Sequence, residues 1–163
     1  MPALRPALVA ALAVTVLAAR AFGPPQITVT EVRGNPPVPG AVLLVEGHHH
    51  TDEPEADLSA RAITIRDGRR VERPVALTRY GAVRHYAVTR QWDGGQAWLL
   101  VFTIKQGVHR ELGTAESFVK VDAGGRVVAI EKVMERNARG DRYPRGATAA
   151  EVDEALRGLG LLR

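Results

Sequence analysis

Apolar and polar residues alternate with a period of two along most of the chain after residue 25. Alternation of this kind predicts β-strands, because successive side chains of a strand point to opposite faces of its sheet. The segments predicted as strands, from this alternation or from a short continuous apolar run, are 27–32, 41–45, 58–64, 71–77, 86–92, 97–104, 115–122 and 126–133. About eight short strands, with turn residues roughly every 8 to 12 positions, predict an all-β antiparallel sandwich.

Three glycine turns predict hairpins between neighbouring strands. Asp67-Gly68 lies between the third and fourth segments, and this dipeptide between alternating strands is a strong signal for a two-residue hairpin. Asp93-Gly94-Gly95 predicts a second hairpin, between the fifth and sixth segments, and Ala123-Gly124-Gly125 predicts a third, between the last two. Pro74 cannot donate a ladder hydrogen bond, so its strand is expected at a sheet edge or at a bulge.

The C-terminal residues have a helical period instead. Thr148 and Glu151 have the spacing of a capping box, and apolar residues follow at helical intervals. A short helix is therefore expected over about 149–157, ended by Gly158 or Gly160.

Two strands need a cover on their outer faces. Segments 41–45 and 98–104 are apolar at nearly every position, which is typical of strands with both faces buried. Docking of the C-terminal helix on their sheet would bury both apolar surfaces, and a homodimer interface would do so equally well.

The first residues predict an export signal. A start that is basic at Arg5 precedes the apolar run 7–19, which is too short for a membrane-spanning helix. The pattern Ala19-Arg20-Ala21 places the cleavage after Ala21, and the alternative is an uncleaved N-terminal anchor. In both cases the remaining chain is expected to be exported, to the periplasm or out of the cell.

Three regions are therefore expected. Residues 1–21 are a signal peptide, 22–135 a β-sandwich domain, and 136–163 a linker followed by the C-terminal helix. The linker, 136–147, is rich in Gly, Arg and Asp and has no hydrophobic period. It contains Arg139-Gly140-Asp141, a tripeptide known from adhesion ligands that also occurs easily by chance.

The composition limits the cellular compartments and the kinds of partner that are expected for this chain. The chain has no cysteine, which excludes disulfides and a lipidated N-terminal cysteine. An exported domain without disulfides depends on its hydrophobic core, and such a chain fits a bacterial envelope. Without Arg5 and Arg20 of the signal, the 22 basic residues become 20 against 18 acidic ones. This near balance makes nucleic acid an unexpected partner.

Three consecutive histidines, His48–His50, are the most distinctive candidate for chemistry. On a strand His48 and His50 would share a face, and such a pair is a half-site for copper or zinc. Further ligands would have to come from elsewhere. The candidates are His85, His109, Asp52, Glu53 and Glu55. The alternative is that the three histidines are simply polar residues where a strand ends and a loop begins.

Two charged clusters have both a binding and a solvent-exposed interpretation. Residues 52–57 carry four carboxylates, which suit calcium but lack the spacing of a calcium loop. The Asp67-Gly68 turn is surrounded by Arg66, Arg69, Arg70 and Arg73. These arginines could clamp phosphate or carboxylate groups of a glycan or lipid, or they could keep an exposed edge from pairing with other strands.

No catalytic signature accompanies the strands. Cysteine is absent, and the only serines, Ser59 and Ser117, lie outside any Gly-x-Ser-x-Gly motif. No Gly-rich phosphate loop or dinucleotide fingerprint follows a strand. The aromatic residues expected in the core are Trp92, Trp98, Phe102 and Phe118. The sequence therefore predicts a protein that is not an enzyme.

Over residues 26–133, the short strands, the Asp67-Gly68 hairpin, and Trp92 and Trp98 around a tight Gly-Gly turn resemble small exported bacterial immunoglobulin-like sandwiches. The resemblance implies an immunoglobulin-like antiparallel β-sandwich and no functional residues. Together with the helical pattern near the C-terminus, the expected fold is this sandwich with one short C-terminal helix.

These observations predict an exported, non-catalytic binding or structural module of the bacterial cell envelope. The expected partner is an envelope protein or a surface polymer, with no membrane span after signal cleavage. No cofactor is required by this hypothesis. The alternative is a periplasmic copper- or zinc-binding protein that uses His48 and His50.

Overall fold

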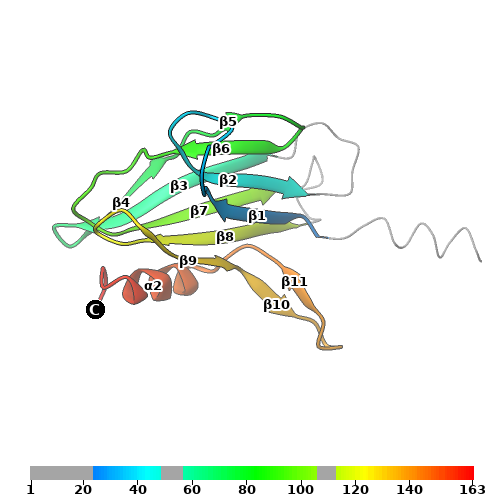
Figure 1. Cartoon of the computed structure of the whole chain (residues 1–163). Coiled ribbons are helices and arrows are strands. Elements are labelled where there is room, and N and C mark those ends of the chain that lie inside the picture. Colours follow the sequence, from blue (N-terminus) through cyan, green and yellow to red (C-terminus); the bar gives the residue numbers. More distant parts are fainter. Residues whose placement is uncertain (1–23, 49–56, 106–112) are drawn as a thin grey trace, which may run out of the picture.

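Strands dominate the computed structural model, which describes residues 24–48, 57–105 and 113–163. The first sheet contains, in spatial order, β1 (Gln26–Glu31), β2 (Ala41–His48), β6 (His85–Thr89) and β5 (Thr78–Arg79). The second sheet contains β4 (Arg69–Pro74), β3 (Asp57–Arg66), β7 (Trp98–Lys105), β8 (Thr114–Val121) and β9 (Val127–Lys132). The chain continues into the hairpin β10 (Met134–Arg136) and β11 (Arg142–Pro144) and ends with helix α2 (Ala149–Gly158). The expected all-β sandwich with a C-terminal helix is confirmed (Figure 1).

The hairpin β3–β4 forms as the sequence predicts. Arg66 pairs with Arg69 across a two-residue turn. Asp67 has φ 52° and Gly68 has φ 72°, and two successive positive values define the turn that suits the twist of a hairpin. Pro74 ends β4, which is an edge strand of the second sheet, so its missing amide proton is not needed in the ladder.

The second predicted hairpin is wrong. Strands β6 and β7 flank the Asp93-Gly94-Gly95 turn but belong to different sheets, since β6 pairs with β2 and β5 while β7 pairs with β3 and β8. The connection crosses between the layers because Trp92 and Trp98 on its two sides are both buried in the core that separates the sheets. The indole nitrogen of Trp98 donates to the Asp93 carbonyl at 3.0 Å, which fixes the crossing. The third predicted hairpin, β8–β9, does form.

The predicted linker 136–147 is also wrong, because it contains the end of one strand and all of another. Met134–Arg136 pairs with Arg142–Pro144. The Asn137 amide donates to the Asp141 carbonyl at 3.0 Å, and the Asn137 side-chain oxygen accepts from the amides of Arg139 and Asp141. Strands of three residues are too short to show a period, so the hydrophobic pattern does not indicate this hairpin.

The sandwich has two hydrophobic cores, one on each side of the second sheet. The larger core lies between the sheets and includes Trp98 and Phe102, while Leu99 and Val101 face the helix. Strand β7 is therefore buried on both faces, as its composition predicts. The four aromatic residues predicted to lie in the core are all buried, namely Trp92, Trp98, Phe102 and Phe118.

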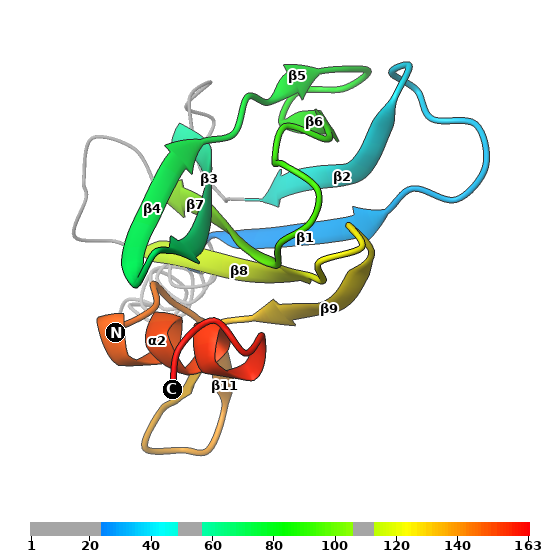
Figure 2. The same ribbon diagram turned by 90° about the vertical axis from the view of Figure 1, so that its left-hand side faces the viewer.

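Helix α2 covers one of the two apolar strands and not the other. Its buried residues Val152, Ala155 and Leu156 pack on the outer side of the second sheet, where Figure 2 shows the helix next to β8. The predicted capping box of Thr148 and Glu151 is present. Strand β2 belongs to the first sheet and alternates between buried and half-buried residues. The expectation that the helix also covers 41–45 is therefore wrong.

Candidate functional site

The described histidines lie on the outer face of the first sheet. Glu46 on β2 is the direct cross-strand partner of His85 on β6, and His48 lies two residues further along β2. The Nε2 atom of His48 is 3.7 Å from the carboxylate of Glu46, and the ring of His85 is 5.8 Å from the ring of Tyr80. Partial burial, and secondarily the Glu46 carboxylate, raise the pKa of Tyr80.

The proposed metal ligands are brought together only in part. The structure places His48 and His85 on neighbouring strands, whereas His50, His109 and the acidic residues 52–56 lie outside the described residues. Within residues 24–48, 57–105 and 113–163, no group of three His, Cys, Asp or Glu side chains is arranged to hold a metal ion. The metal site stays a prediction.

The arginines of the β3–β4 hairpin are mostly paired within the protein. Arg66 and Arg73 both donate to the Asp93 carboxylate, at 3.0 Å and 2.8 Å, and these hydrogen bonds lower the pKa of Asp93. Arg70 forms an ion pair with Asp153 of α2. The guanidinium of Arg73 also lies 4.4 Å from the centre of the Trp98 ring. These internal partners favour a structural role over a clamp for external anions.

An open groove of about 460 Å³ crosses the outer face of the second sheet. Its side chains come from four neighbouring strands, β4, β3, β7 and β8. The lining residues are Ser59, Ala60, Arg61, Glu72, Arg73, Pro74, Val101, Thr103, Lys105, Thr114 and Glu116. The outer face of β7 changes along the strand. Leu99 and Val101 belong to the core under α2, Thr103 and Lys105 line the groove, and Val101 also lines the groove at the border between the two.

The groove has a pre-organised polar floor. The Thr103 hydroxyl donates to one carboxylate oxygen of Glu116 at 2.7 Å, and the Ala147 amide donates to the other at 2.8 Å. Arg61 pairs with Glu72 at 3.4 Å. Lys105, at the end of β7, adds an exposed positive charge to this lining. The floor thus offers hydroxyl groups and charges of both signs on rigid strands.

The groove was missed at the sequence level because its residues are far apart in the chain. One local signal does exist. Three strands of the second sheet have polar residues at alternate positions near one end, namely Ser59 and Arg61, Thr103 and Lys105, and Thr114 and Glu116. The same faces of β3 and β7 become apolar further along, at Ile63 and Leu99. A change from polar to apolar along one face marks the border of the covered area, but only if the pairing is known.

A second polar cluster fixes the C-terminal elements to each other. Arg145 donates to both carboxylate oxygens of Glu151, at 2.8 Å and 2.6 Å, and lies 3.6 Å from Glu135. The hydrogen bonds from Arg145 and from the cap residue Thr148 lower the pKa of Glu151 from its usual 4.5 to about 2. The Glu151 carboxylate raises the pKa of Arg145 in return. The charges of this cluster are satisfied internally, so its role is structural.

Comparisons with family models, with curated proteins and with solved structures found no match for this chain. The described residues include no helix that is long and apolar enough to cross a membrane.

Proposed function

We propose that this chain is an exported, non-catalytic β-sandwich of the bacterial cell envelope that binds another envelope component through the groove on its second sheet. The observation that carries the proposal is the groove itself, a polar surface on rigid strands beside the helix-covered half of the same face. Its described lining contains no histidine or cysteine, and the carboxylate of Glu116 is already held by Thr103 and Ala147. Recognition of a polar partner suits this composition better than proton or group transfer.

The strand order supports an immunoglobulin-like fold. The first sheet runs β1-β2-β6-β5, and the first four strands of the second run β4-β3-β7-β8. In an immunoglobulin sandwich the first, second, fifth and fourth strands form one sheet, and the others form the second sheet. Counting β4 as the additional strand beside β3, the two orders correspond. Strand β9, the hairpin β10–β11 and helix α2 would then be additions at the C-terminal end.

Export is the part of the proposal that the N-terminal sequence supports. The apolar run 7–19 and the pattern before Phe22 favour cleavage by signal peptidase. Mass spectrometry of the protein from the source cells should find a mature N-terminus at or within a few residues of Phe22. An intact Met1 in the envelope fraction would instead mean that the segment is an anchor.

Site-specific crosslinking tests the groove. A photo-crosslinking residue at Thr103 should capture an envelope protein or polymer in the source bacterium, because Thr103 lies on the floor of the groove. The matched control is the same residue at Thr28, which lies opposite Glu46 in the first sheet. The double variant Arg61→Glu, Lys105→Glu should abolish capture at Thr103. Equal capture from both positions, or none from Thr103, would argue against a binding role of the groove.

A copper- or zinc-binding function is the second candidate, and Glu46 is the observation that favours it. Its carboxylate lies next to His48, and its strand position places His85 opposite, so the two described histidines share an outer face. These three side chains are not arranged to hold a metal ion by themselves, so further ligands would have to come from residues outside the described ranges, such as His50 or His109. Calorimetric titration with copper and zinc checks this function. It predicts that His48→Ala and His85→Ala each weaken binding strongly, and unchanged binding in both variants would exclude these two ligands.

A further inference from the structure

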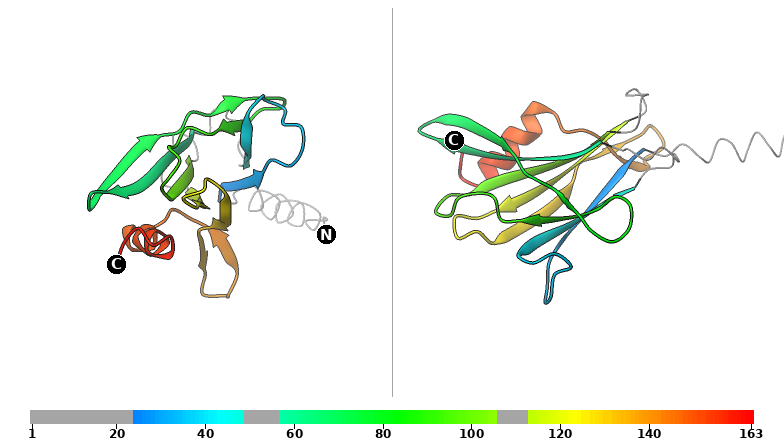
Figure 3. Two further views of the ribbon diagram at one scale, coloured as in Figure 1. Left: turned by 60° about the vertical axis from the view of Figure 1, so that its left-hand side comes forward. Right: turned by 90° about the horizontal axis from the view of Figure 1, so that it is seen from above.

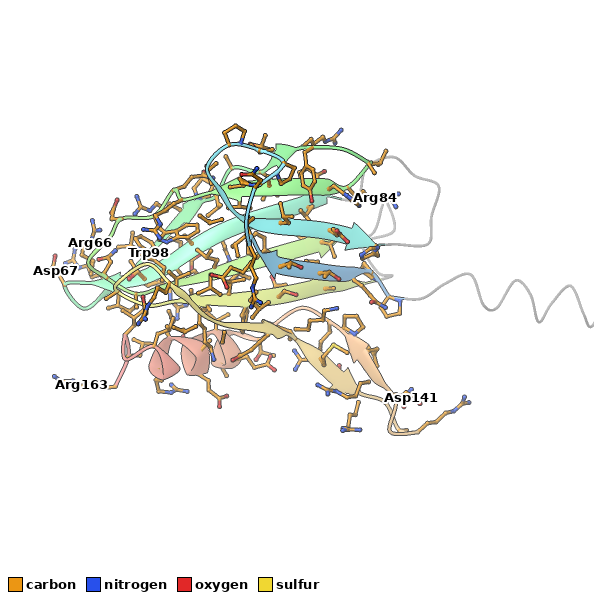
Figure 4. All side chains as sticks on the ribbon, viewed as in Figure 1. Arg66, Asp67, Arg84, Trp98, Asp141 and Arg163 are labelled. Carbon is orange, nitrogen blue, oxygen red and sulfur yellow. The ribbon has the colours of Figure 1, made fainter. Side chains whose placement is uncertain are left out.

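Strand β9 leaves one edge of the second sheet open. It pairs with β8 on one side, and no strand of the described residues pairs with its other side. The chain turns away after β9, because β10 pairs only with β11, and this hairpin leads away from the sandwich with Asp141 near its tip (Figures 3 and 4). The open edge of β9 therefore extends from Val127 to Lys132.

The open edge of β9 is apolar and lacks the protection that edge strands usually have. Charges and prolines at an edge prevent it from pairing with other strands. The opposite edge strand, β4, has this protection in the form of Arg69, Arg70, Arg73 and Pro74. Residues 127–130 of β9 have neither a charge nor a proline. Val128 and Ile130 are 55% and 37% exposed, and they are two of the three large exposed apolar residues in the described part of the chain. Such an edge is suited to pairing with a further strand.

The ladder between β8 and β9 shows which backbone groups face the open side. The Val133 amide donates to the Glu116 carbonyl oxygen at 3.0 Å, so Val133 directs its backbone groups toward β8. This direction alternates along an antiparallel strand, so Ile130 and Lys132 direct their N–H and C=O groups away from β8. The shift in the β8–β9 register falls at Val128, which leaves the following residues of the strand regular. The regular part of β9 thus offers Ile130 and Lys132 for hydrogen bonds to a further strand.

A second copy of the chain matches this edge in one register. Two antiparallel copies related by a two-fold axis place one residue opposite itself, and only Ala129 or Ile130 at the axis leaves most of β9 opposed. With Ala129 at the axis, Arg126 would lie opposite Lys132 of the second copy, and like charges so placed destabilise a strand pair. With Ile130 at the axis, Val128 lies opposite Lys132 and Ala129 opposite Glu131. The charges of β9 therefore favour the register with Ile130 at the axis.

We propose that two copies of this chain pair through β9, with Ile130 of each copy opposite Ile130 of the other. The two isoleucines exchange backbone hydrogen bonds, and the exposed apolar surface of Ile130 and Val128 is reduced. The pairing joins the two second sheets into one continuous sheet with both α2 helices on the same side. It stops at two copies because the outermost strands are then the two protected β4 strands. The described lining of the groove includes no residue of β9, so this contact does not depend on the function proposed for the groove.

Cysteine crosslinking tests the pairing and its register, because the chain has no cysteine of its own. Opposed residues of a hydrogen-bonded antiparallel pair have Cα atoms about 5.5 Å apart, within the roughly 4.4–6.8 Å that a disulfide spans. In protein purified with the N-terminus that the source cells produce, Ile130→Cys should form a disulfide-linked dimer under mild oxidation. The matched control is Val128→Cys, on the same strand and more exposed. Its two copies would lie more than about 10 Å apart in this register, so it should crosslink little.

Analytical ultracentrifugation measures the strength of the pairing. An edge contact is small, so the parent should change from monomer to dimer between roughly 1 and 300 μM. Ile130→Lys should weaken association at least about tenfold, because it places two lysines opposite each other. Ile130→Pro should weaken it similarly, because proline removes an amide that pairs between the copies and faces away from β8 within each copy. Far-UV circular dichroism checks that both variants keep the fold.

A charge swap at residue 128 tests which residues are opposed. Val128→Glu places a carboxylate opposite Lys132 of the second copy in both halves of the dimer, and it should strengthen association about threefold or more. Val128→Lys is the matched variant, and it should weaken association by a similar factor.

Several results would overturn the proposal. They are a parent chain that stays monomeric at about 300 μM, a dimer that both Ile130 variants leave unchanged, and equal crosslinking at residues 128 and 130. A photo-crosslinking residue at Ile130 in the source cells is a separate probe. If it captures a different protein and no second copy of the chain, the edge pairs with a foreign strand and the proposed dimer is wrong.

Discussion

The outer faces of the two sheets differ in how deeply they are buried, although their most apolar strands look alike in the sequence. On the second sheet, Leu99 and Val101 of β7 are fully buried under α2. On the first sheet, the corresponding residues Val42 and Leu44 of β2 remain half exposed, and Leu44 lines a shallow surface groove. An apolar run therefore indicates burial on one face reliably, but burial on the second face depends on which sheet the strand joins.

Chain connectivity explains which sheet receives the helix. Strand β11 pairs with β10 directly after β9, and only a few residues separate β11 from α2, so the helix packs on the sheet that contains β9. The bonds from Ala147 to Glu116 and from Arg145 to Glu151 then set its position over the second sheet. The first sheet lies on the other side of the core, beyond the reach of this short connection.

The largest expected loss of stability comes from disrupting the outer face of the second sheet, which α2 covers. Leu156→Asp should lower the free energy of unfolding by about 3–5 kcal/mol, because Leu156 is fully buried and its replacement would be an unpaired buried charge. The matched substitution Leu44→Asp on the open face should cost less than about 1 kcal/mol. Chemical denaturation of both variants measures the difference. Equal costs would show that the two faces are equally covered in solution.

The next effect concerns the ion pair that holds the helix start. Glu151→Gln should cost about 1–2 kcal/mol at neutral pH, after allowance for solvent screening of the pair. The folded-state pKa of Glu151 is lowered from 4.5 to about 2, so its stabilisation is complete above about pH 4.5 and is lost as pH falls through about 2. Denaturation of parent and variant over this range should therefore converge at low pH. A pH-independent difference would contradict the assignment.

The turn at the edge of the covered sheet should give an effect of about 1 kcal/mol or more. Gly68 has φ 72°, and a β-branched residue resists this conformation, so Gly68→Val should destabilise the hairpin. The control is Gly94→Val, since Gly94 does not have a positive φ and space is open where its side chain would lie. Thermal unfolding distinguishes the two. Identical melting temperatures would mean that the β3–β4 turn is of another type.

The smallest effect tests whether charge or apolar contact docks the helix. The pair of Arg70 and Asp153 joins β4 to α2, but both side chains are more than a third exposed. Asp153→Asn should therefore change stability by less than about 0.5 kcal/mol. A cost near that of Leu156→Asp would assign the docking to electrostatics.

The parts of the fold that the sequence predicts are those with a local cause. The strand positions follow from alternation, the β3–β4 turn from Asp67-Gly68, and the helix from its cap and its apolar face. The pairing of β6 and β7 could not be predicted in the same way. A Gly-Gly turn is compatible with a hairpin and with a crossing between sheets, and the choice depends on contacts with β2 and β3, which are distant in the chain.

Prediction of the candidate site is limited in the same way, because the site depends on contacts between distant parts of the chain. The histidines and the β3–β4 arginines stand out in the sequence because they are adjacent, yet the arginines are mostly used within the fold. Ser59, Thr103 and Glu116 do not stand out, and they form the groove because β3, β7 and β8 are neighbours. Adjacency in the sequence therefore does not show which side chains the fold brings together, whereas the order of strands in the sheet does.

The double burial of β7 has a consequence for how the protein is made. The segment Trp98–Phe102 has no charge and no proline, and its cover, α2, follows all the strands in the chain. During synthesis this strand stays without its cover until residues 149–158 have emerged, and such a segment is prone to intermolecular pairing. Asp93 before it and Lys105 after it are charges of the kind that restrain aggregation of an unfinished chain. Protection of β7 from such pairing thus depends on a helix that is synthesised well after it.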